Sequence, residues 1–592
     1  MKKSDKSAPP FSGAGEDEGA LASAPRRGRG KKEPAVDLVP LGGLGEIGLN
    51  CMALVYGESI LIIDAGLMFP GASQPGVDLV IPDFSFLREN YEDVLGLVLT
   101  HGHEDHIGAL SFLLRDCPGL TVFGTRLTLA LARNRLQEQR QTNLKERVVA
   151  PGDKAELGPF KLEFIRVNHS IPDALAVAVE TPAGVILHTG DFKMDLAAPA
   201  EERLDLHKFA EYGNKGVLAL LSDSTNADVP GFSLSEKAVE RELKDVFVKA
   251  EGRIFLSCFA SSLARIRGVA EAAAFSGRVL AFDGRSVVGN VQLAGELGRL
   301  KLPEGLQVDL SRIDDYPPDR VCVVLTGSQG EPLASLARLA NGVHQKLQIR
   351  PGDLVVFSAR AIPGNEAAIS VLVNLFLERG AEVLDPWCGR PVHASGHGCR
   401  EELKLMYSLV RPRYLVPVHG EHRHLKSHAK LAVELGHPPE RALILKNGRR
   451  LTLKPLSGAQ TGEGENVGRL FVDGSRLGSS LDPVIRKRRK MSGAGLVIVT
   501  AVVERESFRL LSRPRAVIEG VRYERESDFA GPLAEKVEEL IFALLEEHPR
   551  LAEREDAEKF LAERIRVEVR RIFSYLIDRK PVVVSQIIPV DL

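Results

Sequence analysis

Residues 100–108 read Thr-His-Gly-His-Glu-Asp-His-Ile-Gly, and this stretch decides the fold and the chemistry that we predict for the chain. Its potential metal ligands, three imidazoles and one carboxylate within six positions, are His101, His103, Asp105 and His106. The stretch directly follows an apolar run at residues 97–100, which has the pattern of a buried strand. Histidine nitrogens and carboxylate oxygens are preferred ligands of borderline divalent ions such as Zn²⁺. Packing alone gives no reason for so many titratable groups in so short a span, so we predict a metal site here.

Two more candidate ligands, His169 and Asp191, also come just after apolar, strand-like runs. Asp191 is suited to bridge two ions, because a carboxylate offers two oxygens to ions roughly 3.5–4 Å apart. Asp64 ends another apolar run and is predicted to support a ligand histidine from behind. The isolated histidines His188 and His393 are predicted to be structural, since a lone buried histidine is usually satisfied by its neighbours.

The order of segments along the chain indicates an interrupted hydrolase domain. Strand-and-helix units run between residues 253 and 382, and metal-type motifs resume after them at His397 and His419. A hydrolase domain with an inserted α/β domain explains this order. The predicted division is a disordered basic tail at 1–35, the hydrolase domain at 36–230, the inserted domain at 231–360, the rest of the hydrolase domain at 361–455, a linker at 456–494 and a C-terminal domain at 495–592.

Composition excludes several other classes of protein. The chain has 592 residues and a net charge of −2, so its partners are not revealed by overall charge. Its six cysteines form no Cys-x-x-Cys pair, which argues against a zinc ribbon or a secreted disulfide framework. No apolar run approaches the ~18 residues of a membrane span, and the N-terminus lacks the apolar core of a signal peptide. We therefore expect a cytoplasmic protein with no membrane partner.

At this point the motifs resemble a known family. Asp64, residues 101–106, His169 and Asp191 are similar, in order and spacing, to the successive motifs of the metallo-β-lactamase superfamily. Residues 222–226 (SDSTN), 394–397 (ASGH) and 417–421 (PVHGE) resemble the three signature motifs of the β-CASP nucleases.

Further segments narrow the resemblance to the ribonuclease J family of bacteria. They are 42–50 (GGLGEIGLN), 69–83, 284–286 (GRS), 326–332 (TGSQGEP), 362–366 (IPGNE) and 471–474 (FVDG). The resemblance covers about residue 37 to the C-terminus. It implies an α/β fold: a metallo-β-lactamase αββα sandwich, an inserted β-CASP α/β domain and a small α+β C-terminal domain.

The resemblance also implies a role for each site residue. One zinc would be bound by His101, His103 and His169, and the other by Asp105, His106 and His419; Asp191 would bridge them. Manganese or magnesium are alternatives to zinc. His397 would lie beside the scissile phosphate, so that the catalytic set is His397, Asp105 and Asp191. The substrate-binding set is Arg285, Ser328, Gln329, Gly330, Ser395 and His397.

The function implied is metal-dependent cleavage of single-stranded RNA, by 5′-to-3′ exonuclease and by endonuclease action, in RNA maturation and mRNA decay. Family members form homodimers and homotetramers, and other RNA-degradation proteins are expected as partners. Two alternatives stay open from the sequence. One is a small-molecule metallo-hydrolase on the same scaffold, and the other is a catalytically weak RNA-binding subunit of a degradation complex. His419 disfavours a DNA nuclease, because the DNA-repair branch of the family carries an aliphatic residue there.

Three positions depart from the family pattern. Ser262 and Ala264 stand where relatives usually have Asn and His, and Ala361 stands where they tend to have Ser. The polar groups lost at Ala264 and Ala361 belong to segments that resemble the 5′-phosphate pocket, so the preferred 5′ end and the balance of the two nuclease modes stay open.

Overall fold

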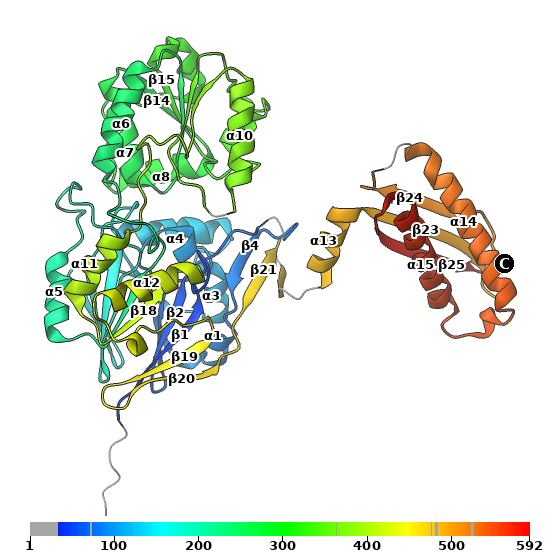
Figure 1. Cartoon of the computed structure of the whole chain (residues 1–592), viewed down its shortest axis with the longest axis horizontal. Helices are drawn as coiled ribbons and strands as arrows, with labels where there is room; N and C mark the ends of the chain where they lie inside the picture. The colour runs from blue at the N-terminus through cyan, green and yellow to red at the C-terminus, as the bar shows by residue number, and fades with distance from the viewer. Residues whose placement is uncertain are drawn as a thin grey trace, which may run out of the picture.

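The computed structural model describes residues 33–71, 74–362, 364–474, 476–479, 483–522 and 526–591 (Figure 1). The predicted basic tail lies outside these residues up to residue 32. The described chain forms three bodies: a sandwich of two sheets, an α/β domain inserted into it and lying above it in the view of Figure 1, and a small domain that stands apart at the C-terminal end.

Two mixed β-sheets form the sandwich. The first has the order β20-β19-β1-β2-β3-β5-β6-β7. Its strands are β20 (Gly458–Gly464), β19 (Arg449–Lys454), β1 (Val36–Gly42), β2 (Cys51–Tyr56), β3 (Ser59–Ile63), β5 (Val94–Val98), β6 (Thr121–Gly124) and β7 (Lys145–Val148). The second has the order β18-β12-β11-β10-β9-β8. Its strands are β18 (Tyr414–Val418), β12 (Ala219–Asp223), β11 (Gly184–His188), β10 (Leu175–Thr181), β9 (Phe160–Arg166) and β8 (Lys154–Leu157).

Both faces of each sheet are covered, which explains the continuous apolar runs in the sequence. In β3, Leu61 and Ile63 face the core between the sheets, whereas Ile60 and Ile62 pack under the outer helices. The helices over the first sheet are α1 (Ser85–Glu89), α3 (Leu110–Asp116) and α4 (Arg126–Glu138). Those over the second are α5 (Leu206–Lys215), α11 (Arg400–Val410) and α12 (His422–Glu434). The predicted αββα sandwich is confirmed.

The inserted domain contains a five-stranded parallel sheet with the order β14-β15-β13-β16-β17. Its strands are β13 (Ile254–Ser257), β14 (Val279–Asp283), β15 (Val321–Leu325), β16 (Leu354–Phe357) and β17 (Glu382–Leu384). One face is covered by α6 (Glu236–Lys249), α7 (Leu263–Phe275) and α8 (Arg285–Glu296), and the other by α9 (Ser335–Ala340) and α10 (Glu366–Glu378).

Two predicted boundaries were wrong. The inserted domain does not end at residue 360, because α10 and β17 complete its sheet and core. Residues 456–494 are not a plain linker. Within them β20 extends the large sheet, and β21 (Arg469–Asp473) pairs with β4 (Leu79–Pro82) and β22 (Arg476–Ser479). The Gly-rich composition of β20 suits an edge strand whose side chains are mostly exposed, so few apolar residues are needed there.

The C-terminal domain is α+β, as predicted. Its sheet has the order β24-β23-β25, formed by β24 (Arg515–Glu519), β23 (Leu496–Glu504) and β25 (Val582–Val590). Helices α14 (Glu526–Glu547) and α15 (Ala557–Ile577) share its core. The linking helix α13 (Pro483–Ala494) packs Ile485 against the sandwich. None of the helices described is long and apolar enough to span a membrane.

Candidate metal centre

The candidate ligands converge because the strands before them end at one edge of the sandwich. His101 follows β5, His169 follows β9, Asp191 follows β11 and His419 follows β18. In an open α/β sheet, side chains just past the carboxyl ends of parallel strands line a common crevice. The short helix α2 (Glu104–Ile107) begins directly after His103 and carries the next two candidates, Asp105 and His106, at the same edge.

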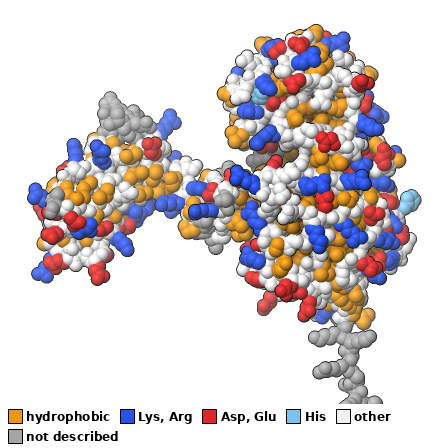
Figure 2. Space-filling view, turned by 180° about the vertical axis from the view of Figure 1, so that it is seen from behind, with side chains coloured by type: hydrophobic (Ala, Val, Ile, Leu, Met, Phe, Trp, Pro, Cys, Tyr) orange, Lys and Arg blue, Asp and Glu red, His pale blue; other side chains and the backbone are white. Residues whose placement is uncertain are grey.

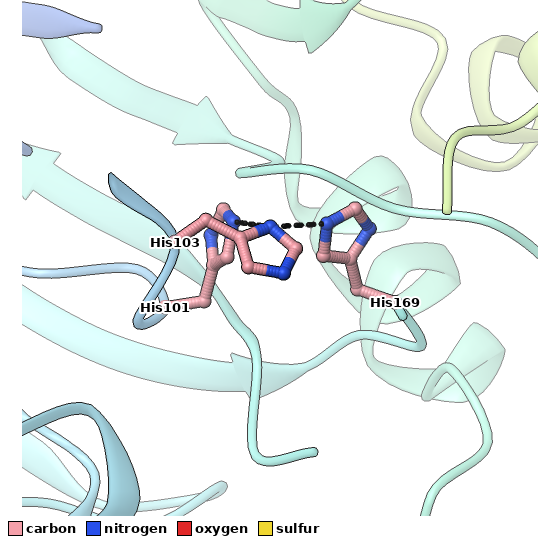
Figure 3. A group of neighbouring side chains, drawn as sticks. All are labelled: His101, His103 and His169. Atoms are coloured by element: carbon pink, nitrogen blue, oxygen red, sulfur yellow. Dashed lines mark hydrogen bonds between the residues drawn. The ribbon is translucent and has the colours of Figure 1, made fainter. Parts of the chain in front are cut away.

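The first group of ligands consists of three histidines, His101, His103 and His169 (Figure 3). The Nδ1 atom of His103 lies 3.1 Å from the Nε2 atom of His101 and 3.1 Å from the Nε2 atom of His169. One nitrogen from each ring lies within 4.8 Å of the others, a spacing that one ion can span.

A close backbone approach orients His169. Its Nδ1 atom donates a hydrogen bond to the carbonyl oxygen of Gly396 over 2.6 Å, which leaves Nε2 as the atom that faces the group. A Cβ atom at position 396 would lie 2.6 Å from Cε1 of His169, so only glycine fits there. Gly396 belongs to the segment 394–397 quoted in the sequence analysis. Its contact with His169 explains why this segment has a glycine at position 396.

The second group consists of Asp105, His106, Asp191 and His419. The Nε2 atom of His106 lies 3.2 Å from Oδ2 of Asp191 and 3.6 Å from Oδ2 of Asp105. The Nε2 atom of His419 lies 3.4 Å from Oδ2 of Asp105, and its Nδ1 atom lies 2.8 Å from Oδ1 of Asp191. Two carboxylates and two imidazoles therefore share one small, mostly buried space.

Asp191 lies between the two groups. Its Oδ2 atom is 3.8 Å from Nε2 of His101 and 3.9 Å from Nε2 of His169, while the same carboxylate contacts His106 and His419. The position is the one that a bridging carboxylate needs.

Backbone strain and buried hydrogen bonds fix this arrangement. Asp64 and His419 both adopt left-handed backbone conformations, with φ of 63° and 52°. Such conformations are unfavourable for residues with side chains and cluster at functional sites. The Oδ2 atom of Asp64 accepts a hydrogen bond from Nδ1 of His106 over 2.8 Å, and its Oδ1 atom accepts one from the backbone N–H of Thr100. Asp64 thus lies behind His106, a candidate ligand histidine.

The two groups differ in electrostatics. Burial lowers the pKa values of His101 and His169 far below the ordinary range and that of His103 to about 4, so these rings stay neutral and keep a lone pair for a metal. Burial alone would also lower the pKa of His419, but the carboxylates of Asp191 and Asp105 raise it to about 10. A proton therefore occupies His419 at neutral pH when no cation is bound.

The donor set fits a pair of divalent cations. The Nε2 atom of His419 is buried and lies 3.4 Å from Oδ2 of Asp105, but it makes no hydrogen bond in the part of the chain that the structure describes. An unpaired buried ring nitrogen is costly unless an ion or a water takes the lone pair or proton. With imidazoles, carboxylates and this orphaned atom facing one space, the residues present suit divalent metal binding.

His397 lies beside the second group and belongs to a third cluster with Asp191, Asp223 and His419. Its Nδ1 atom is 2.8 Å from Oδ2 of Asp223, and its side chain is 20% exposed, against 2% for Asp223. His397 can therefore be reached from the crevice, while Asp223 holds it from behind. Asp223 is absent from our predicted site residues, although it is the second residue of the segment 222–226 that we quoted for the resemblance.

Ser395 connects the site to the segment 222–226. Its Oγ atom accepts hydrogen bonds from Nδ2 of Asn226 over 2.8 Å and from the backbone N–H of His397 over 3.1 Å. Ser395 thus shapes the loop that carries His397.

The remaining predicted substrate-binding residues lie at the carboxyl edge of the β-CASP sheet. Arg285 is exposed as the first residue of α8, just past β14, and Ser328 is buried past β15. The side chain of Gln329 is buried, donates to the carbonyl oxygen of Arg360 and accepts from the backbone N–H of Ile362. Gly330 (φ 79°) has no room for a Cβ, which would lie 2.7 Å from that of Ala368. The polar atoms of Gln329 thus bind its own loops, and Arg285 is the free cation of this predicted set.

The two isolated histidines have structural partners. The Nδ1 atom of His188 accepts a hydrogen bond from the backbone N–H of Gly190 over 3.0 Å. His393 lies with its Nδ1 atom 3.4 Å from the guanidinium of Arg265. Neither belongs to the candidate metal groups of the described residues.

The fold and the site together define a class: a metallo-β-lactamase hydrolase with an inserted β-CASP domain. Four family models match in order. They are the "Metallo-beta-lactamase superfamily" at residues 44–222, the "Ribonuclease J, beta-CASP domain" at 251–376, the "Zn-dependent metallo-hydrolase RNA specificity domain" at 390–443 and the "Ribonuclease J C-terminal domain" at 483–590. The chain belongs to the ribonuclease J family.

Individual relatives are similar in sequence to this chain over most of its length. Ribonuclease J 1 of Streptococcus pyogenes serotype M3 is 37% identical over 565 residues, which cover 95% of this chain and 99% of that protein. Ribonuclease J of Thermus thermophilus is 42% identical over 485 residues, which cover 80% of this chain and 83% of that protein. A crystal structure of a protein of unknown function from Enterococcus faecalis V583 shares the fold, with a TM-score of 0.50 at 16% identity, covering 74% of this chain and 100% of that one.

Proposed function

We propose that this chain is a two-metal ribonuclease that cleaves single-stranded RNA by 5′-to-3′ exonuclease and by endonuclease action, in RNA maturation and mRNA decay. The single observation that carries the proposal is the position of the Asp191 carboxylate between two separate groups of ligands. A small-molecule metallo-hydrolase would not need the inserted and C-terminal domains, both of which match ribonuclease J models.

The proposed ligands follow the two groups. One ion is held by His101, His103 and His169, the other by Asp105, His106 and His419, with Asp191 shared. We propose zinc as the native metal, because nitrogen-rich donor sets suit it, with manganese and magnesium as alternatives. When bound, the two cations lower the pKa of a water to near 7 and neutralise the oxygens of the phosphodiester.

His397 is the proposed proton donor to the leaving oxygen. Burial alone would lower its pKa, but the carboxylates of Asp223 and Asp191 raise it above the ordinary value, which favours the protonated ring that a proton donor needs. The hydrogen bond to Asp223 fixes the ring through Nδ1, which leaves Nε2 as the atom that faces the substrate. A protonated imidazole also stabilises negative charge that develops near it.

RNA is proposed to lie across both domains, from the metal edge of the sandwich to the carboxyl edge of the β-CASP sheet. The exposed guanidinium of Arg285 is suited to hold a phosphate there. All six cysteines are free, five of them buried, which fits the cytoplasmic location that we propose.

Self-association through the C-terminal domain is part of the proposal. Figure 2 shows hydrophobic side chains gathered on this domain, and Val517, Ile588 and Val590 are exposed on its strands. A homodimer or homotetramer that covers them is expected, and other RNA-degradation proteins are further candidates.

The proposal is tested with RNAs that carry a 5′-triphosphate, a 5′-monophosphate or a 5′-hydroxyl group, each with zinc, manganese or magnesium. We expect metal-dependent cleavage that yields 5′-phosphate and 3′-hydroxyl products. Turnover of a chromogenic lactam without RNA cleavage would instead identify a small-molecule hydrolase. RNA binding without metal-dependent decay would identify a catalytically weak subunit.

A further inference from the structure

A buried cluster of charges joins the sandwich to the β-CASP domain close to the metal edge. The sandwich contributes Lys193 and Asp195, which follow Asp191 in the chain, and the β-CASP domain contributes Glu236 from the start of α6 and Arg265 from α7. Lys193 and Arg265 are among the largest fully buried side chains of the described residues.

The charges of the cluster balance across the seam. The Nζ atom of Lys193 lies 3.5 Å from Oε1 of Glu236 and 3.8 Å from Oδ2 of Asp195. The same Asp195 oxygen accepts the backbone N–H of Glu236 over 2.8 Å. Arg265 donates to Glu236 through Nε over 3.0 Å. Two cations thus face two carboxylates. The Lys193 ammonium makes no hydrogen bond within the described chain, so its interaction with Glu236 and Asp195 is that of an ion pair.

Backbone hydrogen bonds tie the same segment to two loops of the metal centre. The backbone N–H of Lys193 donates to the carbonyl oxygen of Asn168, next to His169, over 2.8 Å. The carbonyl oxygen of Phe192 accepts from the backbone N–H of Gly398, next to His397, over 2.7 Å. These backbone bonds do not depend on the Lys193 side chain, so they anchor the sandwich side of the cluster at the metal edge whichever side chain stands at position 193.

On the other side of the seam, Arg265 is bound to the segments that end the β-CASP domain. Its guanidinium donates to the carbonyl oxygen and the hydroxyl of Ser358 over 2.8 and 2.6 Å, at the end of β16. It also donates to the carbonyl oxygens of Val392 and Ala394 over 3.2 and 3.4 Å, just before Ser395. The cluster therefore connects the carboxyl edge of the β-CASP sheet with the segment that returns to the metal centre.

We propose that Lys193 and Glu236 are positioning residues that set the β-CASP domain against the metal edge, so that an RNA held by one domain is presented correctly to the other. This inference rests on the proposed ribonuclease function. Neither residue is among the proposed metal ligands, and neither is predicted to contact the substrate. Their effect is expected on a polymer that spans the seam and not on a small phosphodiester that needs the metal edge alone.

The test compares two substrates in the full chain. One is a 5′-monophosphorylated single-stranded RNA, and the other is bis(p-nitrophenyl) phosphate. The variants are Lys193→Met, Glu236→Gln and the conservative Lys193→Arg. The matched control is Arg253→Met, because Arg253 forms a buried ion pair with Asp353 entirely inside the β-CASP domain, over 2.6 Å. Metal content and melting temperature are measured for every variant.

We expect Lys193→Met and Glu236→Gln to lower kcat on RNA by roughly 10- to 100-fold, the effect of a misplaced substrate. Hydrolysis of the small diester and the metal content should stay close to wild type, and Lys193→Arg should recover part of the RNA activity. If Lys193→Met does not fold, Glu236→Gln, which keeps the shape of the side chain, carries the test.

A parallel loss of both activities would overturn the proposal, because the cluster would then act on the metal edge itself. RNA activity no lower than in Arg253→Met would overturn it as well, since the role would be structural only. A wild-type chain that cleaves neither substrate with metal present would instead refute the proposed function, so the two failures are distinguishable.

Discussion

The two groups of candidate ligands lie side by side but are built differently. The first has three imidazoles that burial keeps neutral, with the shared Asp191 beside them and Asp105 as a second carboxylate near His103. The second pairs two imidazoles with the carboxylates of Asp105 and Asp191. A neutral nitrogen-rich group favours zinc, whereas a carboxylate-rich group also accepts harder ions such as manganese. The comparison teaches that the two ions need not be equivalent in affinity or identity.

Substitution of the shared carboxylate, Asp191, has the largest expected effect on this comparison. Asp191→Ala should remove the bridge from both groups and reduce RNA cleavage by at least about 1,000-fold, because stabilisation of charge in the transition state is lost. Metal content, measured by inductively coupled plasma mass spectrometry, should fall below one ion per chain. The exposed Asp314→Ala serves as the control. Two bound ions and normal cleavage in Asp191→Ala would show that the groups are independent.

The groups can be separated by removing one histidine from each. His103→Ala and His106→Ala should each lose one ion and about 100- to 1,000-fold in cleavage, since each removes part of the electrostatic stabilisation. If the groups differ as described, manganese should restore more activity in His103→Ala, where the carboxylate-rich group is intact, than in His106→Ala. Equal rescue of both variants by every metal would contradict the difference.

A further test asks whether His397 is a proton donor or a metal ligand of the second group. If it is a proton donor, His397→Ala should lower kcat by about 100-fold or more, the range of general acid catalysis, with both ions retained. The dependence of kcat on pH should lose its alkaline limb. A loss of metal in His397→Ala would instead place this residue among the ligands, as the cluster with Asp191 and Asp223 allows.

Asp64 contacts the second group directly, through His106, and reaches the first group only indirectly, through Thr100, whose Oγ1 atom lies 3.1 Å from Nδ1 of His101. Asp64→Asn keeps the shape of the side chain but weakens the orientation of the ring, and changes behind a ligand histidine typically cost about 10- to 100-fold in metal affinity or activity. Metal titration followed by calorimetry should show one weakened ion and one unchanged ion. Two ions weakened alike would mean that Asp64 supports the whole edge.

The smallest expected effect concerns the pH dependence of stability in the metal-stripped chain. The pKa of His103 is lowered from 6.5 to about 4, so the unfolded state binds more protons and stability is lost as pH falls from 6.5 towards 4. The pKa of His419 is raised to about 10, so its stabilisation is complete below 6.5 and is lost as pH rises through 10.

Melting temperatures between pH 4.5 and 10 test both directions. His103→Asn should flatten the acid limb and His419→Asn the alkaline limb, each by a few degrees, at roughly 2–4 °C for each kcal/mol. Parallel curves for the two variants and the wild type would contradict the electrostatic difference between the groups.

Much of the site could be predicted because metal ligands leave a local signal. The loop with His101, Asp105 and His106 is recognised by its high density of potential ligands. His169, Asp191 and Asp64 are recognised by their place at the ends of apolar runs. Asp223 was missed, although it ends the buried strand β12, since a single aspartate has no such density. Its role shows only in the 2.8 Å contact with His397, a residue 174 positions away.

The domain boundaries also depend on contacts between residues that are distant in sequence, which the sequence alone does not reveal. The predicted division ended the inserted domain at residue 360 although its strand-and-helix pattern runs to 382, and it took residues 456–464 for part of a linker, because a glycine-rich edge strand carries little hydrophobic pattern. Their place was decided by pairing with strands distant in sequence: β17 with β16 and β20 with β19.

The ligand types could be predicted from the residues themselves, because residue chemistry is a local property, and the class of fold followed from the resemblance of the motifs to a known family. Only the tertiary structure decided that Asp191 lies between two groups, that Lys193 meets Glu236 across a domain seam, and that Gly396 must be small to let His169 approach. Such relations depend on chain crossings over hundreds of residues, where spacing along the sequence no longer fixes distance in space.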